Sequence, residues 1–155
     1  MRHALTIVFA IAFSAVIAGC SGGPVKQINP PRASIQQLSV QPNGKWQVTV
    51  RLQNFSSVST AFELVDAKLV FAGQAGVTIV LKPAMTIGPE SADILTTVLV
   101  PELGAKLAVA SALSSNQSLR YVLSGQIVTS ELKGNYNFTY ESTLNPAPGL
   151  DGVMR

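Results

Sequence analysis

A strict alternation of apolar and polar side chains restricts the fold of this chain more than any other feature. It is clearest in residues 46–53, which read WQVTVRLQ, so that every second residue from Trp46 to Leu52 is apolar. Side chains of an extended strand point alternately to its two faces. This segment therefore has one dry face and one wet face, which is typical of an antiparallel sheet that packs on one side only.

The same two-residue period recurs along most of the chain. It predicts further strands over 35–40, 62–71, 77–81, 92–100, 121–127 and 136–140. In the strand over 62–71 the apolar positions change face near Leu64, which indicates a bulge or a strand that changes sheets. Residues rich in Gly, Pro and Asn separate the strands and predict turns or loops at 42–44, 73–76, 83–89 and 131–134.

One short helix is predicted over residues 102–113, where Leu103, Leu107 and Ala110 recur at helical spacing. A doubly wound α/β fold needs several long helices, and this is the one candidate. We therefore expect an all-β fold: a seven-stranded antiparallel β-sandwich of the immunoglobulin or fibronectin type, with one short crossover helix. A closed barrel is the alternative.

Four segments in order carry a resemblance to a known domain. Residues 48–57, 69–76, 86–92 and 121–125 read VTVRLQNFSS, LVFAGQAG, TIGPESA and YVLSG. Their apolar strand ending in Asn54, hairpin returning through a Gly, Ile-Gly-x-x-Ser loop and late Tyr-x-x-x-Gly strand resemble the LEA14-like, or water-stress and hypersensitive-response, domain over residues 34–141. The resemblance implies a non-enzymatic sandwich linked to desiccation or osmotic stress, with no catalytic site.

The first 19 residues predict export from the cytoplasm. A basic start, Met1-Arg2-His3, precedes the uncharged apolar run 4–18, which has the length of a secretory signal core and is shorter than a membrane-spanning helix. Small residues then precede the only cysteine of the chain. The sequence Ile17-Ala18-Gly19-Cys20 resembles the lipobox of bacterial lipoproteins.

That second resemblance implies cleavage between Gly19 and Cys20 and a diacylglyceryl thioether on Cys20, often with a third, amide-linked chain. Two acyl chains already give stable membrane anchoring. Lipoproteins with an acidic residue after the cysteine are typically held at the inner membrane, so Ser21 implies a periplasm-facing anchor in the outer membrane of a Gram-negative bacterium. The alternatives are an ordinary cleaved signal or a lone transmembrane anchor, with Cys20 an incidental thiol.

These interpretations divide the chain into four parts. A lipoprotein signal peptide (1–19) is followed by a lipidated tether rich in Gly and Pro (20–33), the sandwich domain (34–144) and an irregular C-terminal tail (145–155). The formal net charge is +3, but Lys and Arg are scattered singly along the chain. We therefore expect the membrane, through Cys20, and envelope proteins as partners, and no nucleic acid.

Candidate catalytic chemistry is sparse. The one His, His3, leaves with the signal and acylation consumes Cys20, which excludes Ser-His and Cys-His nucleophile pairs and the usual soft-metal ligands. We expect no enzymatic activity, no cofactor and no metal. Two pairs of nearby carboxylates are interpreted as solvated. Glu63 and Asp66 are expected on opposite faces of a strand, unless a bulge brings them together. Glu90 and Asp93 border a loop, where a cap or a cation site is the alternative.

Three further sequence patterns could indicate a functional site, but each also has a simpler explanation. Residues 130–133 match the Ser-x-x-Lys spacing of penicillin-binding enzymes, and 114–123 are faintly similar to a peptidoglycan-binding motif. Both are interpreted as coincidences, because the partner motifs and the α/β pattern are missing. Aromatic residues on the strands either line a groove or belong to the core, and the core is favoured: Trp46, Tyr136, Phe138 and Tyr140.

Two functions remain open at this stage. The favoured one is a tethered, non-catalytic sandwich that acts as a stress-protective or envelope interaction module. The alternative is a carrier of a lipid or other apolar ligand, or an accessory subunit of an envelope transport complex, with the ligand held between the sheets or beside the crossover helix. A hydrolase is a distant third.

Overall fold

A computed structural model describes residue 23 and residues 25–71, 76–130 and 134–155. The predicted signal peptide, Gly19 and Cys20 lie outside the described residues, as do most of the predicted turns at 73–76 and 131–134 and the lysine of the Ser-x-x-Lys pattern.

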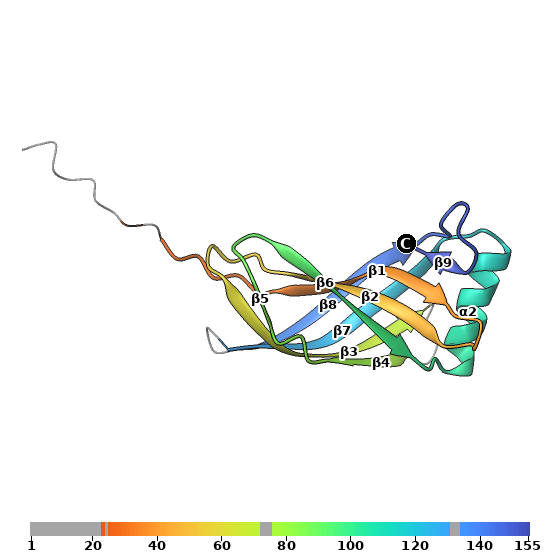
Figure 1. Ribbon diagram of the computed structural model, residues 1–155, viewed down its shortest axis with the longest axis horizontal. Helices are drawn as coiled ribbons and strands as arrows, with labels where there is room; N and C mark the ends of the chain where they lie inside the picture. The colour runs from red at the N-terminus through yellow and green to blue at the C-terminus, as the bar shows by residue number, and fades with distance from the viewer. Residues whose placement is uncertain (1–22, 24, 72–75, 131–133) are drawn as a thin grey trace, which may run out of the picture.

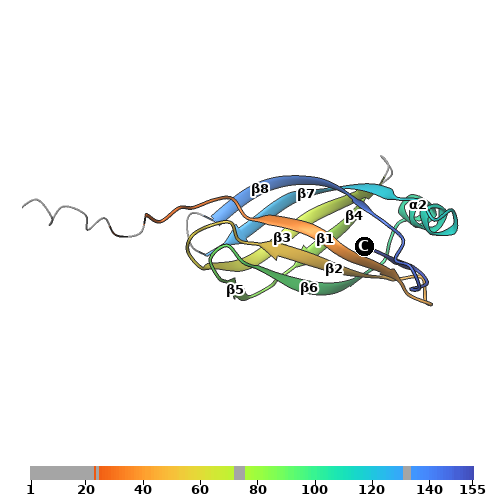
Figure 2. The same cartoon turned by 90° about the horizontal axis from the view of Figure 1, so that it is seen from above.

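The described chain forms two antiparallel sheets that pack face to face (Figures 1 and 2). The first sheet has the order β6-β2-β1-β9, with bounds Ala92–Leu99, Trp46–Gln53, Arg32–Val40 and Val153–Met154. The second has the order β4-β3-β7-β8, with bounds Val77–Leu81, Thr60–Phe71, Leu119–Thr129 and Gly134–Leu144, and β5 (Met85–Ile87) also pairs with β3. The all-β sandwich predicted from the alternation is confirmed.

Apolar residues from both sheets fill the space between them. On β2, Trp46, Val48, Val50 and Leu52 are all buried, as the alternation predicts, and the Trp46 ring meets Phe71 of β3 edge to face at 5.8 Å between centroids. Phe138 and Tyr140 on β8 are half-buried and pack against this core, and Tyr136 is half-buried as well. The prediction that the four aromatic residues belong to the core is therefore confirmed for Trp46, whereas the other three are only half-buried.

Both sheets contain a bulge in a long strand. The pairing of β3 with β7 shifts register between Phe62 and Leu64, which confirms the bulge predicted there. The extra residue turns both Phe62 and Val65 toward the core. The pairing of β1 with β2 shifts between Ile35 and Gln37.

Helix α2 (Leu103–Ser114) leads from β6 in one sheet to β7 in the other, so the predicted crossover helix is confirmed. Two of the residues that predicted the helix lie on its solvent-exposed face, however: Leu103 and Leu107 are 72% and 62% exposed. The buried residues are Ala105, Val109 and Ala112. Small side chains face the sandwich here because they let the helix backbone lie close to the ends of the strands.

Two short strands raise the number from the predicted seven to nine in the described residues. Strand β5 lies inside the region predicted as a loop, and β9 lies in the tail predicted to be irregular. The tail folds back on itself through paired hydrogen bonds between Asn145 and Arg155, and buried Met154 fills the core beside β1. Such long-range contacts hold this two-residue strand in place. It was not predicted, because two residues are too few to show an alternating pattern.

The segment before β1 is attached to the sandwich rather than extended from it. Asn29 donates through its side-chain amide to the Phe55 carbonyl at 2.8 Å, and its backbone N–H donates to the Ser56 hydroxyl. Gln27 donates its backbone N–H to the Ser57 hydroxyl at 2.8 Å. Strand β1 begins at Arg32, whose guanidinium carbon lies 4.9 Å from the Phe55 ring centroid. The predicted tether is thus fixed to the domain from residue 27 onward.

Candidate functional site

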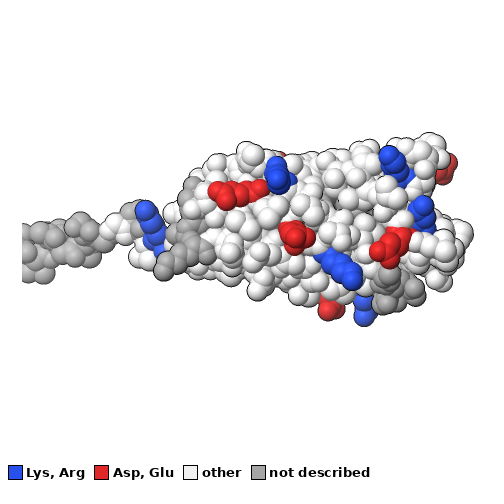
Figure 3. All heavy atoms as spheres, turned by 90° about the horizontal axis from the view of Figure 1, so that it is seen from below, with Lys and Arg blue, Asp and Glu red and all other residues white. Residues whose placement is uncertain are grey.

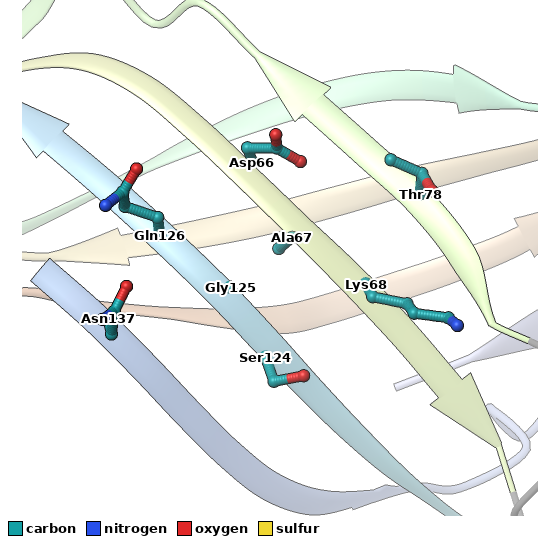
Figure 4. A pocket seen from close by; sticks show the side chains of 8 residues that line it. All are labelled: Asp66, Ala67, Lys68, Thr78, Ser124, Gly125, Gln126 and Asn137. Carbon is teal, nitrogen blue, oxygen red and sulfur yellow. The ribbon is translucent and has the colours of Figure 1, made fainter.

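A shallow trough of about 440 Å³ lies on the outer side of the second sheet (Figure 4). Two cross-strand rows of side chains line it. Asp66, Gln126 and Asn137 are paired neighbours on β3, β7 and β8, and Thr78, Lys68 and Ser124 are paired neighbours on β4, β3 and β7. The trough therefore presents amide, hydroxyl, carboxylate and ammonium groups to solvent.

Close approach of two strands shapes the floor of this trough. A Cβ atom on Gly125 of β7 would collide with the backbone carbonyl of Asp66 and would lie 2.6 Å from the Cα atom of Ala67. Only a residue without a side chain fits at this position. Gly125, which the sequence singled out as the Gly of the Tyr-x-x-x-Gly strand, therefore has a structural role.

The predicted carboxylate pairs are exposed. The β3 bulge leaves both Glu63 and Asp66 exposed, which corrects the expectation that their odd offset would place them on opposite faces. Glu90 and Asp93 are also exposed, and the Asp93 carboxylate accepts a hydrogen bond from the backbone N–H of Ile94. No group of three or more His, Cys, Asp or Glu side chains suited to a metal ion occurs among the described residues.

The Asn54 predicted to end β2 is a buried structural residue. Its amide nitrogen lies 2.8 Å from the Val58 carbonyl, 3.1 Å from that of Ile87 and 2.9 Å from that of Gly88. Its amide oxygen accepts from the Ser56 backbone N–H at 2.9 Å. Asn54 thus joins the β2–β3 turn to the loop after β5, and both amide N–H groups of this buried side chain are engaged by backbone carbonyls.

An apolar pocket of about 190 Å³ lies beside α2, where the helix faces the β1–β2 turn. Sequence reasoning named the region beside the crossover helix but not these residues, which come from segments far apart in the chain. The lining is Val40, Gly44, Trp46, Lys106, Val109, Ala110 and Leu113. Apolar walls with a single charged group are more typical of a small-molecule site than the open polar trough is.

Lys106 is the charged group of this pocket. Its ammonium nitrogen lies 4.0 Å from the point where a Cβ atom on Gly44 would stand, so it is held over the β1–β2 turn. Gly44 has a φ of 76°, as expected for the Gly of the predicted Pro-Asn-Gly turn. The side chain of Lys106 is exposed, which keeps its ammonium group in water at the mouth of the pocket.

A row of exposed aliphatic residues runs along β6 and continues into α2, which lies at the same end of the sandwich as the pocket. These residues are 51–72% exposed: Ile94, Val98, Val100, Leu103 and Leu107. β6 is an edge strand that pairs with β2 alone among the described strands. We call these five residues the apolar row.

Charge is spread thinly over the surface. Figure 3 shows single basic and acidic side chains scattered over one face, with no patch of one sign. None of the helices in the described part of the chain is long and apolar enough to span a membrane.

Comparisons with known proteins return similarity in structure alone. No family model matches the chain, and no curated protein matches it. A solved protein from Archaeoglobus fulgidus is 11% identical with a TM-score of 0.45, and covers 77% of this chain and 98% of its own. A protein from Arabidopsis thaliana is 14% identical with a TM-score of 0.46, and covers 83% of this chain and 85% of its own. A candidate late embryogenesis abundant (LEA) protein is 9% identical with a TM-score of 0.48, and covers 95% of this chain and 88% of its own. Scores of this size do not establish a common origin, so the function below is argued from this chain's own residues.

Proposed function

We propose that this chain is an envelope lipoprotein, anchored through acyl chains on Cys20 to the periplasmic face of the outer membrane, whose sandwich is a non-catalytic interaction module. The lipobox resemblance of residues 17–20 supports the anchoring, and the fixed N-terminal segment is the structural observation that supports the orientation of the domain. Gln27 and Asn29 are hydrogen-bonded to the Phe55–Ser57 turn at one end of the sandwich, while α2 closes the other end (Figure 1).

This attachment limits how far the domain can stand from its anchor. A stretch as long as that from Cys20 to Lys26 spans at most ~25 Å even when fully extended. Strand β8 alone, with 11 residues, is about 36 Å long. We therefore propose that the end with the Phe55–Ser57 turn stays near the lipid surface and that the α2 end, with its part of the apolar row, faces the periplasm.

The occupant we assign to the apolar row is an envelope protein that adds an extended, apolar segment to the open edge of β6. An exposed edge strand offers unpaired backbone groups for such strand addition, and aliphatic side chains beside it provide the contact area. After the proposed cleavage before Cys20, the protein's own N-terminal stretch is too short to reach α2 from the opposite end of the sandwich, so we assign the row's α2 end to a second protein.

Photo-crosslinking in living cells tests this assignment. A photoreactive residue in place of Val98 or Leu107 is expected to give one discrete adduct with a second protein, mapped by mass spectrometry to an extended segment of that partner. The matched control is the same residue in place of Thr78, an exposed position on the outer side of the other sheet. Crosslinks to lipid alone, or equal crosslinking at Thr78, would contradict the assignment.

In the cell, we propose that this interaction module protects the envelope during drying. The LEA14-like resemblance of the sequence suggests this role. Cells that lack the gene are expected to survive desiccation less well than the parent, and a gene copy with the wild-type chain restores survival. A copy carrying Cys20→Ala, which removes the acylated sulfur, is expected not to restore it. Unchanged survival of the deletion strain counts against the protective role while leaving the anchored interaction module standing.

A carrier of a small apolar ligand is the second candidate, and the pocket beside α2 favours it. Its walls are formed mainly by aliphatic and aromatic side chains, and it is partly enclosed by α2 and the β1–β2 turn. Native mass spectrometry of the detergent-extracted lipoprotein tests this candidate. A co-purifying ligand that is lost when the pocket is filled supports a carrier, and ligand-free protein in every preparation contradicts it.

A further inference from the structure

We infer that the pocket beside α2 binds a small carboxylate with a short apolar chain or ring, with the apolar part inside the pocket and the carboxylate on Lys106. This inference rests on the second candidate function and names its ligand class.

The pocket is built to remove an apolar group from water. Trp46 and Val109, each 1% exposed, line it together with the apolar side chains of Val40, Ala110 and Leu113. Burial of apolar surface against such walls is favourable in proportion to the area removed from water. The Lys106 ammonium and the Trp46 indole N–H are the two side-chain donors among the described lining residues, so a ligand that is polar throughout would lose most of its hydration there without compensation.

The volume limits the size of the ligand. At about 190 Å³ the pocket is slightly larger than the ~150 Å³ apolar cavity known to hold benzene. It accommodates a ring or a few methylene groups. It is too small for the acyl chains of a whole membrane lipid, which separates this ligand class from a phospholipid.

The positive charge of Lys106 determines which sign of charge the ligand's head group carries. The described lining contains Lys106 and no Asp or Glu, so its ammonium is the one charged group that lines this pocket. The flexible lysine side chain keeps this group at the water-exposed mouth. An anion whose chain enters the pocket can therefore reach the ammonium while it remains partly solvated. A cationic head group would be repelled at the same position.

Trp46 provides a direct readout, because it is the only Trp in the chain and lines the pocket. We suggest titrating the full-length lipoprotein in detergent with octanoate, octanol and octylamine while recording Trp fluorescence. The expected result is a saturable change with octanoate, a weaker response to octanol and the weakest to octylamine. Equal or tighter binding of octylamine, or no saturable change with octanoate, would overturn the inference.

Two variants separate the pocket from unspecific contact with the surface. Ala110→Phe places a ring in the pocket from an exposed helix position and is expected to weaken octanoate binding at least tenfold. Its control, Ser114→Phe, adds the same ring outside the lining and is expected to leave octanoate binding unchanged. Lys106→Gln is expected to weaken octanoate binding about threefold, the effect of one exposed ion pair, and to leave octanol binding unchanged. Lys82→Gln removes the same charge elsewhere and serves as its control.

The outcomes distinguish failure of this inference from failure of the carrier function. A ligand found by native mass spectrometry together with no effect of octanoate on Trp46 overturns the carboxylate class and leaves a carrier. Octanoate that binds Ala110→Phe as tightly as wild type overturns the location. Circular dichroism and thermal unfolding of each variant show that the sandwich is retained.

Discussion

The phenolic hydroxyl of Tyr121 on β7 is hydrogen-bonded to the backbone of Ile35 on β1, in the opposite sheet. The Ile35 N–H donates to this oxygen at 3.1 Å, and the hydroxyl lies 3.4 Å from the Ile35 carbonyl. The contact falls where β1 shifts register against β2, between Ile35 and Gln37. Tyr121 thus ties the two sheets together at the bulge, and its 2% exposure keeps the link away from water.

We predict that Tyr121→Phe lowers the free energy of unfolding by about 1–2 kcal/mol, because the Ile35 N–H then has no partner in a buried position. Chemical denaturation monitored by Trp46 fluorescence measures the change. Tyr136→Phe, on the half-buried face of β8, is the control and is expected to cost less. Equal losses for the two variants would show that the Ile35 contact does not stabilise the fold.

The same residue gives stability a pH dependence in the alkaline range. Burial raises the pKa of Tyr121 above its ordinary value of 10.0, and outweighs the opposing effect of its hydrogen bonds with Ile35 and Ser142. The unfolded chain therefore loses this proton at a lower pH than the folded chain, so stability is fully present below pH 10.0 and falls as pH rises from there through the folded pKa. Unfolding free energies measured across this range are expected to fall less steeply for Tyr121→Phe than for wild type. Parallel curves would contradict the prediction.

Gly125 on β7 is predicted not to tolerate a larger residue. Gly125→Ala forces a Cβ atom against the backbone of Asp66 and Ala67, and separation of β3 from β7 is expected to cost about 3 kcal/mol. Thermal unfolding checks this. Gly88→Ala is the matched control, because a Cβ atom there meets the Ser91 hydroxyl at an ordinary 3.7 Å.

Asn54→Ala is predicted to destabilise the sandwich by about 3 kcal/mol, because it leaves the carbonyls of Val58, Ile87 and Gly88 without the amide that joins them. Asn137→Ala, at an exposed position in the trough, is the control and is expected to change stability little. Denaturant unfolding of the two variants measures the difference, and similar midpoints would argue against a joining role for Asn54.

Local patterns predicted the parts of the fold that local physics determines. The period of two gave β2 with its bounds, the loss of period at Leu64 gave the β3 bulge, and Pro-Asn-Gly gave a turn with positive φ at Gly44. The helix was found, but not its buried face, because apolar residues occur on both faces of α2 and spacing alone cannot choose between them.

Features that depend on distant residues could not be predicted. The attachment of Asn29 to the Phe55–Ser56 turn joins segments 26 and 27 residues apart through single polar groups. Pairing of Met154 with Leu38 is likewise invisible locally. The pocket beside α2 needs the β1–β2 turn and the helix to meet, so only the general region, and neither Lys106 nor Ala110, was anticipated.

The most direct test of an anchored module is the intact mass of the protein purified from cell envelopes. We expect a mature chain that begins at Cys20, carries the mass of a diacylglyceryl group with or without a third acyl chain, and fractionates with the outer membrane. A chain that keeps residues 1–19, or one that carries an unmodified Cys20 and fractionates as soluble protein, would contradict the anchoring on which the proposed orientation depends.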